Sequence, residues 1–213
     1  RNAYRAYYEH MPLRLTSRPN GISMRLYRPF QFGTLIELNI LDTRQYRTPL
    51  PRSSTEMRSP ISNILGKPQE AWLYDRFGKS QAIWNVVAQQ VIMTEISEGL
   101  KWADKWSGYR ASRERLFEAL KNKNVSNPVI LSGDHHRNWA ANLLQDFDDQ
   151  DSLVIGTEFV GTSISSNGDG KDMTRKGKKR LDNNPHLKFF NYQRGYVRLD
   201  VSPEIWRTDF QVV

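Results

Sequence analysis

Asp134 and His136 are the two residues whose types and spacing are best suited to chemistry. They follow an apolar stretch, residues 128–131, and Gly133, which permits a sharp turn at the end of a strand. In an extended chain, residues two apart project from the same side. A carboxylate and an imidazole placed in this way can bind one cation, and open α/β sheets bind ligands where their strands end. The spacing alone equally allows a helix capped by Asp134, with surface histidines.

Four other polar residues are candidates for the same site, and each has a structural alternative. His186 precedes a predicted strand and is a candidate catalytic contact to a phosphate or a leaving group, or else a satisfied loop histidine. Arg44 is able to bind phosphate through two nitrogens, although a pair with Asp42 that braces the sheet is the favoured interpretation. Gln89 and Gln90 end an apolar stretch. Gln90 is a candidate for substrate binding, and capping of backbone groups is the alternative.

The composition describes a basic globular chain. Its 213 residues carry a net charge of +8, which favours anionic partners such as phosphate esters, nucleic acids or anionic surfaces. There is no cysteine, so no disulfide forms within the chain. No run of apolar residues reaches the length of about 18 that spans a membrane. Residues 1–5 lack an apolar core and are not a signal peptide.

The first half of the chain alternates between helical and extended patterns. Pro12 would end the first helix, and Pro68 would begin a later one. The apolar run 82–88 fits a buried strand or a helix, and its Trp, Ile and Val favour a strand. We predict helices over 4–10, 68–78 and 113–121, strands over 33–42, 82–88 and 125–131, and an irregular loop over 48–67. This alternation predicts a layered α/β domain.

The second half of the chain has a different character. Five short strands are predicted, which we expect to be successive strands of one sheet. They cover residues 153–155, 159–164, 187–191, 196–201 and 206–212. Residues 171–180 are rich in Lys and Arg and are predicted to form a solvated flexible loop, with attraction of anionic substrates as a secondary role.

Several short segments occur in an order that is specific, although each one alone is weak. They are YYEHMP (7–12), LDTRQYR (41–47), LGKPQEAWL (65–73), AQQV (88–91), WSGY (106–109), GDHH (133–136), EFVGTSI (158–164), NPH (184–186) and RGY (194–196). Together they resemble the PhoD-type alkaline phosphatases over nearly the whole chain. That resemblance implies an α/β (α+β) fold of the metallophosphoesterase type, in which two sheets pack face to face between helices.

The resemblance also implies a function and a set of metals. Members of the family hold ferric iron (Fe3+) with calcium ions, and their Gly-Asp-x-His motif falls on Gly133, Asp134 and His136. Asp134 and His136 are therefore expected to be metal ligands, and the expected activity is hydrolysis of phosphate monoesters and diesters. The resemblance raises the expectation that His186 reaches the site. Some relatives act as phospholipase D, which makes phospholipid hydrolysis the alternative activity.

The family's remaining metal ligands, among them a Cys, an Asp and a Tyr, come from motifs upstream of the segment that matches residue 1. Residues 1–213 are therefore expected to form the C-terminal part of one catalytic domain. An upstream segment, or a second polypeptide, would complete the site. The family is exported, so a secreted or periplasmic location is expected. A non-enzymatic anion- or nucleic-acid-binding module would suit the charge, but no helix-turn-helix or aromatic–basic RNA motif supports it.

Overall fold

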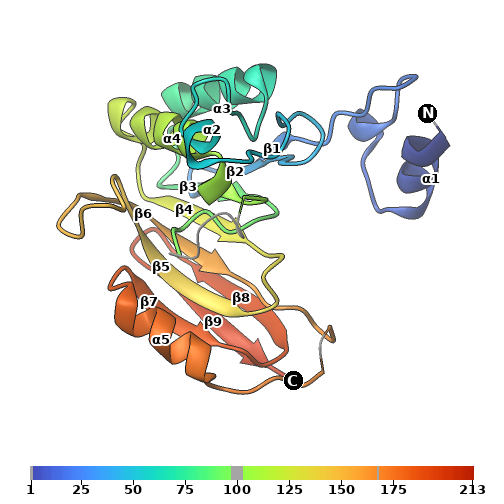
Figure 1. Ribbon diagram of the computed structural model, residues 1–213. Coiled ribbons are helices and arrows are strands. Elements are labelled where there is room, and N and C mark those ends of the chain that lie inside the picture. Colours follow the sequence, from blue (N-terminus) through green and yellow to red (C-terminus); the bar gives the residue numbers. More distant parts are fainter. Residues whose placement is uncertain (1, 97–102, 167) are drawn as a thin grey trace.

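The computed structural model describes every residue except 1, 97–102 and 167 (Figure 1). The helices are α1 (Asn2–His10), α2 (Ser54–Met57), α3 (Lys67–Lys79), α4 (Arg110–Asn122) and α5 (Arg175–Asn183), with 3-10 turns η1 (Leu15–Ser17) and η3 (Trp106–Gly108). The strands are β1 (Arg28–Phe32), β2 (Ile36–Ile40), β3 (Trp84–Ala88), β4 (Pro128–Ser132), β5 (Asn138–Leu144), β6 (Val154–Val160), β7 (Leu187–Asn191), β8 (Gly195–Val201) and β9 (Trp206–Val212). Within the described residues, no helix is long and apolar enough to cross a membrane.

Seven of the strands form one mixed sheet in the order β1-β2-β3-β4-β6-β5-β7. The pairs β2–β3, β3–β4 and β4–β6 are parallel, so the carboxyl ends of these four strands meet at one edge of the sheet. The outer pairs β1–β2, β6–β5 and β5–β7 are antiparallel. The remaining strands, β8 and β9, form a separate antiparallel hairpin. The parallel edge is the place where the fold is able to gather polar side chains.

The sheet lies between helices and the β8–β9 hairpin (Figure 1). On β3, Val87 joins the buried core that packs under α3 and α4, whereas the ring of Trp84 lies 5.6 Å from that of Trp206 on β9. On β7, Phe189 stacks on Phe210 of β9 at 4.9 Å, and the next residue, Phe190, belongs to a second buried cluster. Because these positions are an odd number of residues apart, they point to opposite faces of the sheet.

The predicted α/β class and most of the predicted elements are confirmed, and the metallophosphoesterase-type sandwich stays a prediction. The chain is a mixed α/β protein with a seven-stranded sheet and a small second sheet. The helix predicted over 68–78 is α3, which has Pro68 in its first turn and basic residues in its last turn. The strands predicted over 187–191 and 206–212 coincide with β7 and β9.

Three predictions for the second half are wrong. The strands do not belong to one sheet, because β8 and β9 pair only with each other. Residues 153–155 and 159–164 do not form two strands; one continuous strand, β6, covers Val154–Val160. The basic segment predicted as a loop contains helix α5, whose first turn is capped by the side chain of Thr174. The sequence analysis also missed β1, β5 and the short α2 inside the 48–67 loop.

Candidate active site

The Gly133–Arg137 segment forms a tight corner between β4 and β5. Asp134 has a φ of 65° and His136 a φ of 53°, so both lie in the left-handed region that non-glycine residues rarely adopt. The extended conformation expected at these two residues is therefore wrong. A helix capped by Asp134 is also excluded, because strand β5 follows from Asn138. Residues held in such conformations are concentrated at functional sites.

His135 anchors the corner from the inside. Its side chain is buried, and its Nδ1 accepts a hydrogen bond of 2.8 Å from the indole nitrogen of Trp139. The two rings stack with centroids 5.8 Å apart. Burial, assisted by the nearby cations Lys105 and Arg137, lowers the pKa of His135 to about 2. A neutral imidazole is the form that accepts from an indole N–H, so His135 has a structural role here.

Arg194 holds the corner from the other side. Its buried guanidinium donates to the carbonyl oxygen of His136 at 3.1 Å and to the carbonyl of Tyr192 at 2.7 Å. It also donates to the Ser163 hydroxyl and the Ser166 carbonyl, both at 2.9 Å. One side chain thus ties the corner to the loop that follows β6. The sequence analysis missed this role, although Arg194 lies in one of the matched segments.

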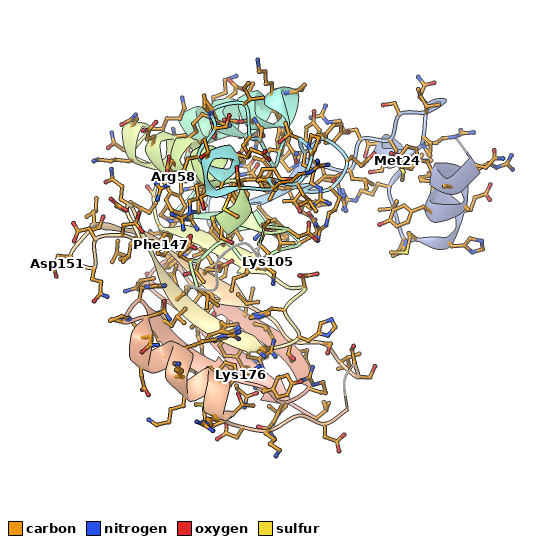
Figure 2. All side chains as sticks on the ribbon, in the orientation of Figure 1. Met24, Arg58, Lys105, Phe147, Asp151 and Lys176 are labelled. Atoms are coloured by element: carbon orange, nitrogen blue, oxygen red, sulfur yellow. The ribbon has the colours of Figure 1, made fainter. Side chains whose placement is uncertain are left out.

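The Asp134 carboxylate, which is 44% exposed, faces two cations. Lys105 Nζ lies 3.6 Å from one carboxylate oxygen and Arg44 Nη2 lies 4.0 Å from the other. Lys105 lies near the middle of the molecule in Figure 2. Its burial lowers its pKa, and Asp134 opposes this shift. The Asp134 carboxylate is therefore accompanied by positively charged groups able to receive an anion.

Arg44 lies at this edge as predicted, but the favoured pairing with Asp42 is wrong. The Asp42 carboxylate accepts from the backbone nitrogens of Arg44 and Gln45, each at 2.9 Å, and so caps the turn after β2. The Arg44 guanidinium points instead to Asp104, at 2.6 Å, and to Asp134. Arg47 pairs with the same Asp104 carboxylate. Asp104 thereby holds Arg44 beside the corner.

Gln90 has the capping role that the sequence left as its alternative. Its oxygen accepts from the backbone nitrogen of Thr43 at 2.8 Å, and its nitrogen donates to the Leu41 carbonyl at 2.8 Å. These bonds fix the turn that carries Arg44. Gln89 donates to the Ser132 hydroxyl at 2.6 Å and so connects the ends of β3 and β4. Direct contact between Gln90 and a substrate stays a prediction.

The structure does not bring His186 to the corner. In the β5–β7 pairing, Asn138, which follows the corner, lies opposite Asn191, whereas His186 bonds to Asn142 further along β5. The His186 ring is buried, contacts the carbonyl of Glu95 at 2.8 Å and meets the Phe147 ring edge-on. Burial lowers its pKa. His186 is thus a histidine whose ring has a partner within the fold, which was the alternative to a catalytic role. A catalytic role for His186 stays a prediction.

Glu158, a residue that the sequence analysis did not single out, lies directly beneath the corner. It is fully buried and accepts from the backbone nitrogens of Met93 and Thr94, each at 2.7 Å, and from the Ser132 hydroxyl at 2.5 Å. Burial raises its pKa, and these three hydrogen bonds oppose the shift. The only signal was a glutamate within an otherwise apolar strand that belongs to a matched segment. Glu158 joins the ends of β4 and β6 to the 93–94 backbone.

Comparison with known proteins identifies the family. Residues 1–210 match the family model of the PhoD-like phosphatases. This chain belongs to that family. It is 47% identical over 222 aligned residues to alkaline phosphatase D of Bacillus subtilis (strain 168). The match covers 99% of this chain but 38% of that relative.

A solved structure agrees with this assignment. The structure described as "Structure of PhoD" superposes with a TM-score of 0.93 at 47% identity, covering 99% of this chain and 42% of that one. The two folds are therefore closely similar over the whole of this chain. The chain spans about two fifths of the length of the PhoD-like proteins that it matches.

The corner of this PhoD-like chain carries two side chains of types that bind metal ions. Asp134 and His136 offer a carboxylate oxygen and an imidazole nitrogen, which iron accepts, and the carboxylate also suits calcium. His136 Nδ1 lies 3.4 Å from the Ser166 hydroxyl, a contact of the kind that orients metal-bound histidines. Within the described residues, no group of three or more His, Asp or Glu side chains is placed to hold a metal ion. The donor types fit the metals that the resemblance implies, and their number is too small for a complete site.

Proposed function

We propose that the protein to which these residues belong is a metal-dependent hydrolase of phosphate monoesters and diesters. Asp134 and His136 would be ligands of its iron and calcium centre. Membership in the PhoD-like phosphatases supports the reaction class. The observation that carries the assignment of residues is the corner after β4, where Asp134 and His136 both adopt left-handed conformations and Asp134 lies beside Arg44 and Lys105.

Each group at the corner has a distinct part in this reaction. A bound cation would supply a Lewis acid and a nucleophilic hydroxide at neutral pH. Arg44 has a guanidinium that matches two phosphoryl oxygens, and its contact with Asp104 fixes its direction. Lys105 adds a second positive charge on the same side as Asp134. These charges would stabilise the additional negative charge that develops on the phosphoryl oxygens.

We propose that residues outside this chain complete the site. Two donors are fewer than iron or calcium requires, since calcium alone takes six to eight oxygen ligands. The matched relatives are longer than this chain, which spans 38% of one and 42% of the other. An upstream segment or a second polypeptide would supply the other ligands, and it would extend the β8–β9 sheet into the second layer of a metallophosphoesterase-like sandwich. A secreted or periplasmic location, where calcium is plentiful, belongs to the same proposal.

The proposal is tested by His136→Ala in the complete protein. The variant is expected to lose bound iron or calcium in elemental analysis, and its hydrolysis of p-nitrophenyl phosphate is expected to fall on the order of 100-fold or more. His10→Ala is the matched control, because His10 is an exposed histidine at the end of α1. A His136→Ala protein that keeps its full metal content and its activity would show that the corner is not the metal site.

A further inference from the structure

A cavity of about 540 Å³ lies between helix α1 and the end of strand β2. Tyr4 and Tyr7 from α1 form one wall, and Met24, Leu26 and Leu41 are among the apolar residues of the other. Met24 is labelled between α1 and the sheet in Figure 2. The volume is in the range of pockets that bind small molecules, about 300–1,000 Å³.

The deeper wall of this cavity is rigid. Met24 and Leu41 are each only 1% exposed. The side chain of Gln45 donates to the Met24 carbonyl at 3.0 Å, and Gln90 donates to the Leu41 carbonyl at 2.8 Å. Because these polar groups bond to the backbone of the apolar residues, the apolar side chains are left to line the cavity. A preformed apolar wall binds a ligand without first having to be ordered.

The cavity shares one residue, Arg44, with the candidate active site. Arg44 contributes to the cavity wall, and its guanidinium lies 4.0 Å from the Asp134 carboxylate. A phosphate ester whose phosphoryl oxygens bind Arg44 would therefore have its organic group beside the aromatic and aliphatic wall.

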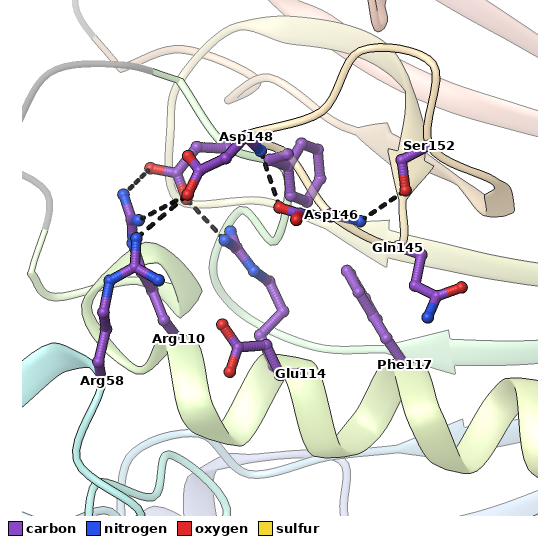
Figure 3. Close-up of a pocket in the computed structure, with 11 residues that line it drawn as sticks. Arg58, Arg110, Glu114, Phe117, Gln145, Asp146, Asp148 and Ser152 are labelled. Carbon is purple, nitrogen blue, oxygen red and sulfur yellow. Dashed lines mark hydrogen bonds and ion pairs between the residues drawn. The ribbon is translucent and has the colours of Figure 1, made fainter.

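A second cavity differs from the cavity beside α1, because its charged residues pair with one another (Figure 3). It has a volume of about 430 Å³, and its wall includes Arg58, Arg110 and Asp148. The arginines face the carboxylate there, Arg58 at 3.1 Å and Arg110 at 4.0 Å. Its charges are largely directed at one another, and Asp134 and Arg44 are not part of its wall.

The geometry points to a leaving-group subsite in the cavity beside α1, specific for phosphate esters of apolar alcohols. This inference rests on the proposed phosphatase function and adds the chemical class of the alcohol. The ester oxygen would lie near Arg44, and the alkyl or aryl group would bury its surface against Tyr4, Tyr7 and the Met24 wall. Each buried methylene is expected to raise kcat/KM about fourfold.

The test compares ethyl phosphate with hexyl phosphate on the complete protein. The two leaving groups have similar intrinsic reactivity and differ by four methylenes, so full burial predicts a ratio of kcat/KM on the order of 100 in favour of hexyl phosphate. In the double variant Tyr4→Ser/Tyr7→Ser this ratio should fall at least tenfold. Tyr8→Ser is the matched control, because Tyr8 lies on the same helix and lines a different cavity.

The outcomes separate this inference from the proposed function. If ethyl phosphate is hydrolysed but the chain length has no effect, the subsite is refuted and the phosphatase function stands. That result is also the one expected if other parts of the complete protein fill the cavity. A ratio that Tyr4→Ser/Tyr7→Ser leaves at the wild-type value refutes the location. If neither ester is hydrolysed, the proposed function itself fails and the subsite fails with it.

Discussion

Replacing Glu158 by Gln should weaken both the fold and the candidate metal site. One Glu158 oxygen accepts from Met93 N and Ser132 Oγ, and the other accepts from Thr94 N. A glutamine has only one acceptor oxygen in its side chain, and its amide group would face a donor. At least one of the three hydrogen bonds is therefore lost in any orientation of the amide.

The size of the effect follows from the contacts. A hydrogen bond to a charged acceptor contributes about 1.5–3 kcal/mol, and the abandoned Thr94 N–H would cost about 1–3 kcal/mol more. The neutral amide recovers part of the cost of burying a carboxylate, which is the cost that raises the Glu158 pKa. We therefore expect a net loss of about 2 kcal/mol in the free energy of unfolding. Because Ser132 precedes the corner, a loss of metal affinity of about 10- to 100-fold should accompany it.

The assay is urea denaturation of the complete protein, together with a metal titration. Glu118→Gln is the matched control, because Glu118 is an exposed glutamate on α4. It should change the free energy of unfolding by less than about 0.5 kcal/mol. If Glu158→Gln is as stable as Glu118→Gln and binds metal with wild-type affinity, Glu158 does not support the corner.

Two further predictions concern the buried His135 and Arg44, which is proposed to bind phosphate. The His135 pKa is lowered to about 2, so its contribution to stability is complete above the unfolded value of about 6.5 and is lost as the pH falls below it, by about 1.4 kcal/mol per pH unit. Between pH 7 and pH 5.5, the free energy of unfolding should therefore fall less for His135→Gln than for the wild type. Equal falls in the two proteins would show that His135 is not a buried neutral histidine. Arg44→Lys should lower kcat/KM for phosphate esters about 10- to 100-fold, because lysine lacks the two-pronged donor geometry. Kinetics of the exposed control Arg52→Lys should be unchanged, and an Arg44→Lys enzyme with wild-type kinetics would remove Arg44 from the site.

The fold was predictable where local patterns decide the structure. Helix α3 has a proline at its start and basic residues at its end, and β9 is a short segment in which Trp206, Phe210 and Val212 lie an even number of residues apart. Helix α5 was missed because its lysine-rich sequence has no apolar stripe. It is held instead by the Thr174 cap and by close packing, since a Cβ at Gly177 would lie 2.1 Å from the Phe190 ring. Tertiary contacts of this kind leave no local signal.

The site was predictable only in part for a related reason. The sequence singled out Asp134 and His136 because both belong to one short motif, residues 133–136. Glu158 and Lys105 lie 24 and 29 residues from Asp134 in sequence. The pairing of β4 with β6 brings Glu158 to Ser132, and Lys105 reaches Asp134 as a long-range ion pair. Strand patterns do not specify strand partners, which also explains why the β8–β9 hairpin was assigned to the wrong sheet.

The corner itself is a balance between backbone strain and the contacts around it. Two non-glycine residues in the left-handed region cost roughly 1–2 kcal/mol each. The hydrogen bond from the Arg194 guanidinium to the His136 carbonyl contributes about 1.5–3 kcal/mol, and the bond from Trp139 to His135 about 0.5–1.5 kcal/mol. The cost of the backbone strain and the contribution of the two hydrogen bonds are similar, so neighbouring residues of this chain are sufficient to hold the corner. The backbone of Asp134 and His136 is thus already held in place, and a cation bound there, as proposed, would not have to supply the energy to form this conformation.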